Sequence, residues 1–259
     1  MEIKIIDDKE YSFTIKENEM NGITGTHKEE VVNKIYFKKK DKGKIYINEE
    51  ELTSEERIKF KNKISIIEEE MDPLQLQQKV YECMYLEIQR RNLELSDPKK
   101  KIIDSLKIVD LDMNYLNRNI NDLSSSEKKL LQIGLSLMTN PEVIILIEPF
   151  KKFDKNTERR ILLFLQKIKE LYDKTIVFVT EDANKLYPFT SHIIIEKNHK
   201  ILIEGDTKEV YGKVEFLKKN RIQLPKIVEF TYLAKKNKKA RIDYHRDIRD
   251  LIKDIYKHV

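Results

Sequence analysis

The chain has 259 residues, 40% of them hydrophobic, which is enough for a real core in one α/β domain with an appendage or in two small domains. Its 50 basic and 45 acidic side chains nearly cancel to a formal charge of +5, so nucleic acid is not an expected partner. The longest strongly apolar run, Val143–Ile147, is far shorter than the roughly 20 residues that cross a bilayer.

The first ten residues have no apolar core, so we expect no secretory signal. The only cysteine, Cys83, can form no internal disulfide. This suits a reducing compartment, and we expect the side chain to serve in packing rather than as a nucleophile.

Apolar clusters predict short strands at residues 2–6 and 11–15, and a helix after Lys28. Between them lies the sequence GITGTHKEEVV, at residues 22–32, which has the outline of a phosphate-binding loop, G-x-x-x-x-G-K-[ST]. A strand, a tight turn and a helix therefore follow one another.

The phosphate-binding outline is incomplete, since only Gly22 and Lys28 fit it. His27 replaces the second glycine, and Glu29 replaces the hydroxyl that would bind Mg²⁺. One damaged motif has little specificity, so a second interpretation stays open. In it GITG is a turn, and Glu29 and Glu30 are acids that the helix dipole favours.

Residues 44–48 alternate as a strand, and the lysine run at 38–40 is typical of a solvated loop at a sheet edge. From about residue 72 to residue 123 the pattern becomes helical and polar, with Pro98 interrupting it. This segment is predicted to be a helical insert.

The α/β pattern then returns. Ser124 and Glu127 have the spacing of a capping box at the start of a helix. The following apolar run is typical of a strand buried on both faces, and it ends in Glu148. An acid at that end lies where open α/β sheets bind their ligands.

A helix is predicted at residues 157–171 and a second buried strand begins at residue 175. Residues 192–206 predict a hairpin with Asn198 and His199 at its turn. The last segment carries an apolar stripe that predicts packing on its own domain or on a partner subunit, with a membrane surface as the less suited alternative. The stripe consists of Ile248, Leu251, Ile252, Ile255 and Val259.

The order of these pieces resembles an ATP-binding cassette domain, the motor subunit of ABC transporters. The pieces are the phosphate loop, GKIYIN, the helical insert, LSSSEKK, VIILIEPF, KKFD, TIVFVTED and ILIEGDTKEVY. The tail is similar to that of the energy-coupling-factor ATPases of cobalt-type vitamin and metal importers. The resemblance implies a P-loop NTPase-like α/β core with a mixed sheet at residues 1–211, a helical subdomain at about 72–138, and a C-terminal helical extension at 212–259.

Aligning the strand FTIK with the family makes Gly25 the first loop glycine, with only Thr26 and His27 before Lys28. The loop is then about three residues shorter than the usual motif. In either register, Glu29 and the next residue stand where the family has hydroxyls.

The family signature LSGGQ, which caps the nucleotide of the opposite subunit, corresponds to Leu123–Glu127. Ser124 and Ser126 hold its nucleotide-contacting positions, but both glycines are lost and the terminal amide has become an acid. The aspartate that supports Mg²⁺ is replaced by Ile147, while the general-base position keeps Glu148.

The D-loop aspartate corresponds to Asp154, the switch histidine to Glu181 and the glutamine loop to Glu69. Tyr11 is a poor substitute for the aromatic residue on which adenine stacks. The resemblance implies one catalytic candidate, Glu148, and no metal ligand. The six nucleotide-binding candidates are Gly25, Lys28, Ser124, Ser126, Asp154 and Glu181.

Carboxylates at phosphate-facing positions oppose a triphosphate, so we expect ATP binding to be weak or absent, without Mg²⁺ and with lost or slow hydrolysis. Lys28 is expected to pair with Glu29 or Glu181, so that an internal carboxylate replaces the missing phosphate.

The resemblance implies a degenerate cassette subunit that pairs with another ABC ATPase subunit, with a transmembrane transporter component as a further candidate partner. Its expected location is cytoplasmic or peripheral on the inner face of the cell membrane. Two alternatives stay open: an ATPase completed by an intact partner cassette, and a soluble regulatory or structural protein of the same fold.

Overall fold

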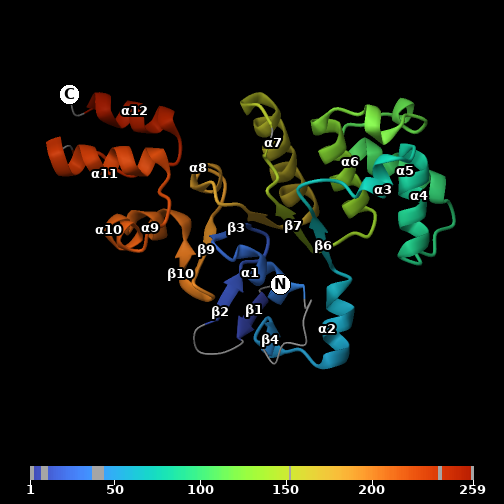
Figure 1. The fold of residues 1–259 in the computed structure, drawn as a ribbon, viewed down its shortest axis with the longest axis horizontal. Helices are drawn as coiled ribbons and strands as arrows, with labels where there is room; N and C mark the ends of the chain where they lie inside the picture. Colours follow the sequence, from blue (N-terminus) through green and yellow to red (C-terminus); the bar gives the residue numbers. More distant parts are fainter. Residues whose placement is uncertain (1–2, 7–10, 37–43, 152, 239–240, 258–259) are drawn as a thin grey trace. The chain divides into compact units, whose positions relative to one another are not determined.

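The structure is a computed structural model that describes all residues except 1–2, 7–10, 37–43, 152, 239–240 and 258–259 (Figure 1). The chain forms two compact units. The first unit combines Met1–Thr53 with Val177–Val259, and the second unit is Ser54–Ile176. The predicted lysine loop at 38–40 and the last residue of the C-terminal stripe, Val259, lie outside the described residues.

The first unit contains an antiparallel sheet in the order β2-β1-β4-β5. In its register Ile3 pairs with Ile15, and Ile5 with Phe13, so these four buried side chains occupy alternate positions. The period of two that predicted the strands therefore buries one face. The strands are β1 (Ile3–Ile6), β2 (Ser12–Ile15), β4 (Lys44–Ile47) and β5 (Glu50–Glu51).

The first unit also holds the mixed arrangement that positions the phosphate-loop residues. Strand β3 (Met20–Gly25) is parallel to β9 (His192–Lys197), which is antiparallel to β10 (Lys200–Asp206). The predicted hairpin is confirmed, with Asn198 at φ 54° and His199 at φ 62° in its two-residue turn.

The C-terminal helices of the first unit gather beyond β10 (Figure 1, orange to red). Of the predicted stripe, Leu251 is buried at 1% exposure, whereas Ile248 is 57% and Ile252 is 45% exposed. Packing on the chain's own unit is therefore confirmed for Leu251 only, because the short helix α12 turns part of that face inward, and packing of the exposed part on a partner subunit stays a prediction. The helices of this unit are α1 (Lys28–Ile35), α8 (Ala183–Leu186), α9 (Thr207–Gly212), α10 (Val214–Lys219), α11 (Lys226–Lys238) and α12 (Ile248–Lys257).

In the second unit, β6 (Ile64–Ile67) is parallel to β7 (Val143–Ile147), and Ile66 lies opposite Ile145. The predicted helical character of the insert is confirmed, and α4, α5 and α6 pack on one another (Figure 1). Cys83 of α4 is buried, and this burial raises the pKa of its thiol to about 12, as expected of a packing residue.

The helical segments of the second unit are α2 (Ser54–Lys61), α3 (Pro73–Leu76), α4 (Val80–Arg90), α5 (Pro98–Ile108), η1 (Met113–Tyr115), η2 (Ile120–Asp122), α6 (Ser125–Leu137) and α7 (Lys155–Tyr172). Strand β8 (Thr175–Val179) begins in this unit and ends in the first. At its start the Thr175 N–H donates to the Glu142 carbonyl, and just beyond its end the Thr180 N–H donates to the Ile23 carbonyl.

Gly25 is required where β3 meets β9. It lies opposite Glu196 at φ 139°, a conformation that favours glycine, and a Cβ atom there would lie 2.2 Å from the Glu196 carbonyl oxygen. No side-chain rearrangement relieves this contact, because the neighbouring atom belongs to the backbone.

We expect Gly25→Ala to lower the free energy of unfolding by about 2–4 kcal/mol, since strain and a backbone clash act together. Urea denaturation measures the change. Gly212→Ala is the matched control, because nothing lies within 4 Å of the added methyl group. That variant should stay within about 1 kcal/mol of the parent chain, and equal stabilities for both variants would contradict the assignment.

Candidate functional site

The loop between β3 and α1 consists of Thr26 and His27 alone, since the strand ends at Gly25 and the helix begins at Lys28. This confirms the shortened loop that the FTIK alignment predicts. The ungapped alternative is wrong, because Gly22 lies inside β3 opposite Ile193.

The interpretation of GITG as a turn is also wrong, since these residues, at 22–25, complete strand β3. Its other half is confirmed, because Glu29 and Glu30 do lie in the first turn of α1. That position is favourable for a carboxylate near the helix N-terminus.

Lys28 is held by two carboxylates. Its side chain is buried, and Nζ lies 2.9 Å from Glu181 Oε1 and 3.5 Å from Glu29 Oε1. The prediction that an internal carboxylate pairs with Lys28 is therefore confirmed. The side chain of Glu181 is 68% exposed, so water screens the pair and its contribution stays below about 1 kcal/mol.

A third carboxylate, that of Glu196, accepts a hydrogen bond from the backbone N–H just before α1. The His27 N–H donates to Glu196 Oε2 at 2.6 Å, and the His199 N–H donates to Glu196 Oε1 at 2.7 Å. Glu196 is fully buried, at 0% exposure. In a phosphate-binding loop such N–H groups point at the ligand, whereas here a side chain of β9 receives one.

Two histidines cover this carboxylate. The rings of His27 and His199 stack with centroids 3.9 Å apart, and His199 Nδ1 lies 2.8 Å from Glu30 Oε1. The roles of Glu196 and His199 were missed from sequence. A signal existed, because Glu196 is the one acid in the buried run HIIIE.

In the second unit, the signature-loop residues cap α6. Ser124 and Glu127 exchange hydrogen bonds in the predicted capping box, and Ser124 Oγ lies 3.1 Å from Ser126 Oγ. Tyr115 donates to Glu127 Oε1 at 2.6 Å, and these hydrogen bonds lower the pKa of Glu127 to about 2. The presence of an acid at position 127 is therefore explained by the contacts at the start of α6.

Glu148 and Asp154 lie at the end of β7 and the start of α7. Glu148 adopts φ 42°, a left-handed conformation that costs a non-glycine residue about 1 kcal/mol. Asp154 is the N-cap of α7 and accepts from the Asn156 and Thr157 N–H groups at 2.8 and 3.0 Å. Hydrogen bonds from Thr157 and Asn156 lower the pKa of Asp154.

Glu69, matched to the glutamine loop, pairs with Lys151 at 3.0 Å. Its carbonyl accepts from Lys129 Nζ at 3.0 Å, and the Glu68 carbonyl accepts from the same atom at 2.8 Å. Burial lowers the pKa of Lys129 to about 8. In the first unit, Tyr11 is 4% exposed against Phe13, so its ring offers no free face for stacking.

Among the described residues, no group of three or more His, Cys, Asp or Glu side chains is arranged to hold a metal ion. None of the helices in the described part of the chain is long and apolar enough to cross a membrane.

The fold and these motifs define an ATP-binding cassette. Residues 9–151, more than half of the chain, match the family model described as ABC transporter. The chain therefore belongs to the ABC transporter family.

Its similarity to named proteins agrees with this. It is 24% identical to the energy-coupling factor transporter ATP-binding protein EcfA2 of Acetivibrio thermocellus, over 80% of this chain and 72% of that protein. It is 32% identical to EcfA2 of Mycoplasmopsis synoviae over 52% of this chain, but the match spans only 44% of that relative.

Among solved structures, cbiO1 from Clostridium perfringens, part of the ABC transporter complex cbiONQ, superposes with a TM-score of 0.71. It is 20% identical and covers 89% of this chain and 98% of its own. With 20% sequence identity, this similarity establishes only the fold, which is that of an α/β ABC cassette.

Replacing Lys28 by Met should lower the free energy of unfolding by about 1 kcal/mol, because Glu181 and Glu29 lose their shared cation. Thermal unfolding would then show a decrease of about 2–4 °C for a chain of this size. Lys219→Met, an exposed lysine of the same unit, is the control that should change nothing. An unchanged melting temperature for Lys28→Met would count heavily against the pairing.

Glu127 should make stability depend on pH. Its pKa is lowered from 4.5 to about 2, so its stabilisation is complete above the unfolded value and is lost as pH falls toward 2. Glu127→Gln should therefore be less stable than the parent chain by about 1 kcal/mol at pH 6, and the difference should shrink below pH 4.5. Urea titrations at several pH values measure this; a constant difference would reject it.

Proposed function

We propose that this chain is a degenerate ATP-binding subunit of an energy-coupling-factor type transporter, with lost or weak ATP binding and hydrolysis. It acts as a dimer partner rather than as a motor. The observation that carries the proposal is the occupation of the phosphate-loop groups by carboxylates of the chain itself: Glu181 and Glu29 on Lys28, and Glu196 on the His27 N–H.

These contacts oppose triphosphate binding electrostatically. A cassette binds triphosphate through loop N–H groups, a lysine and Mg²⁺. An incoming phosphate would have to displace Glu181 from Lys28 at 2.9 Å while Glu29 remained nearby. Two unit charges of like sign at 4 Å repel by about 1 kcal/mol in water and about 4 kcal/mol near a protein surface.

Mg²⁺ does not fit the residues at this loop. Glu29, where the family has a hydroxyl, is turned to Lys28, and the strand-end position that supports the metal holds Ile147. A chain that lost the metal would lack the cation that lowers the pKa of the attacking water. These residues therefore do not support metal-assisted hydrolysis.

The partner assignment rests on family likeness and on the retained framework. The relatives include energy-coupling factor ATP-binding proteins, and cbiO1 belongs to a transporter complex. We extend this to an intact ABC ATPase subunit as the partner, with a transmembrane component as the second contact. Glu148, Ser124, Ser126 and Asp154 would then keep the family positions without supporting full turnover.

The division of the chain remains a proposal as well. We assign residues 1–211 to the cassette, with its helical subdomain at about 72–138, and residues 212–259 to a C-terminal extension.

Calorimetric titration with ATP, with and without Mg²⁺, tests the proposal. We expect a dissociation constant near or above about 1 mM in both conditions, because the loop groups are already paired. Glu181→Gln should strengthen binding about tenfold, since it removes a carboxylate that lies 2.9 Å from Lys28 Nζ. Glu209→Gln, an exposed acid of the same unit, is the control for net charge.

A micromolar affinity, together with Mg²⁺-dependent turnover that Glu148→Gln abolishes, would overturn the proposal. Turnover that appears only after an intact cassette subunit is added would favour the alternative of a completed ATPase. Neither turnover nor association with a cassette partner would favour a regulatory or structural protein.

A further inference from the structure

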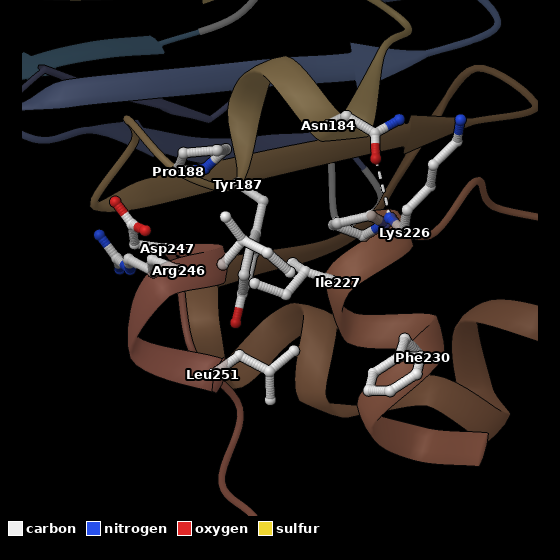
Figure 2. Close-up of a pocket in the computed structure, with 11 residues that line it drawn as sticks. Asn184, Tyr187, Pro188, Lys226, Ile227, Phe230, Arg246, Asp247 and Leu251 are labelled. Carbon is white, nitrogen blue, oxygen red and sulfur yellow. Dashed lines mark hydrogen bonds between the residues drawn. The ribbon is translucent and has the colours of Figure 1, made fainter. Parts of the chain in front are cut away.

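An apolar pocket of about 560 Å³ lies within the first unit, between α8 and the C-terminal helices α11 and α12 (Figure 2). It is separate from the phosphate-loop residues, and none of its lining residues belongs to the candidate nucleotide site. Its volume is within the range of pockets that bind small molecules.

The walls of the pocket are mainly apolar. Ile227 and Phe230 of α11 face the pocket together with Leu251 of α12 (Figure 2). Leu251 is buried, whereas Phe230 at the opening is 52% exposed. An occupant with an apolar body would remove this surface from water, which is favourable in proportion to the area covered.

One wall carries a buried donor without an acceptor. Tyr187 follows α8, its side chain is fully buried, and within the described part of the chain its hydroxyl has no hydrogen-bond partner. Its ring descends from α8 between Arg246 and Ile227, with the hydroxyl end toward Leu251 (Figure 2). Burial raises the pKa of Tyr187 to about 12, so the hydroxyl is neutral and able to donate at physiological pH.

The charged side of the pocket has an incompletely paired cation. Arg246 Nη2 lies 3.6 Å from Asp206 Oδ2, which is too far for a hydrogen bond. The other oxygen of Asp206 already caps α9. The neighbouring Asp247 is held by Arg249 at 2.7 Å, and this arginine lowers the pKa of Asp247 to about 2. The guanidinium of Arg246 thus keeps donors for an anion.

A hydrogen bond joins two of the segments that line the pocket. The Lys226 N–H at the start of α11 donates to Asn184 Oδ1 on α8 at 2.8 Å (Figure 2). This contact holds the start of α11 beside α8 without a ligand, so that part of the wall needs no ordering on binding.

We propose that this pocket binds a small carboxylic acid with an aromatic or branched apolar body. The body contacts Ile227, Phe230 and Leu251, the carboxylate pairs with Arg246, and the Tyr187 hydroxyl donates to an acceptor on the ligand. This site is independent of the proposed function of the phosphate loop, so either can fail without the other.

The test compares two probes that share one apolar body, 2-naphthoate and the uncharged 2-naphthylmethanol, by calorimetry on the full chain. We expect 2-naphthoate to bind one site with a dissociation constant of about 1 mM or below, and the alcohol to bind about tenfold more weakly. Arg246→Gln should abolish this preference for the acid. Tyr187→Phe should weaken naphthoate binding roughly three- to tenfold.

Ile227→Trp fills the pocket and should abolish binding, whereas Leu233→Trp, on the same helix but outside the pocket, should leave it unchanged. No heat up to about 5 mM naphthoate, equal binding of acid and alcohol, or full binding by Ile227→Trp would each overturn the proposal. A second copy of the chain could instead occupy the pocket, which would also overturn the proposal. In that case the apparent molecular mass would rise with protein concentration, naphthoate would not change it, and Ile227→Trp would prevent the rise.

Discussion

The buried carboxylate of Glu196 is the contact on which the loop region of the first unit depends. It accepts the amide hydrogens of His27 and His199, so it joins the start of α1 to the turn of the β9–β10 hairpin. Its own backbone approaches Gly25 so closely that only glycine fits there. A buried carboxylate needs several donors to offset its desolvation. The register of β3 on β9, the short loop and the hairpin turn are therefore mutually constrained, and Lys28 is presented to Glu181 and Glu29 as a consequence.

The acidic residues at the family's motif positions have different structural roles. Glu127 completes a capping box with Ser124 and accepts from Tyr115, and Asp154 caps α7. Both are explained by helix termini that need acceptors for their free N–H groups. Glu181 differs, because it is far from Lys28 in sequence and meets it only through the fold. Carboxylates reach the phosphate-loop residues through such non-local pairs, whereas the acids of the signature loop and the D-loop serve their own helices.

Helix α8 separates two sites in the first unit with different chemistry. Glu181 precedes it and faces Lys28, while Tyr187 follows it and lines the apolar pocket. Conserving the architecture of a cassette does not by itself conserve its chemistry, since function depends on the side chains placed on the fold. The carboxylates that pair with the loop residues lie on one side of α8, and a separate concave surface lies at the C-terminal helices on the other.

The sequence by itself determined the elements whose signals are local: the alternating strands β1 and β2, the apolar strand β7, the two-residue hairpin turn at Asn198 and His199, and the capping box at Ser124. Their order carried the resemblance that predicted the cassette fold, and the alignment of FTIK with that family predicted the short loop. Only the tertiary structure decided that GITG ends a strand, that Glu196 takes the loop amide, that Leu251 is buried while Ile248 and Ile252 stay exposed, and that Tyr187 lines a pocket. The physical reason is distance along the chain. Propensity and periodicity act over a few residues, whereas a hydrogen bond between His27 and Glu196 exists only after β3 and β9 have paired.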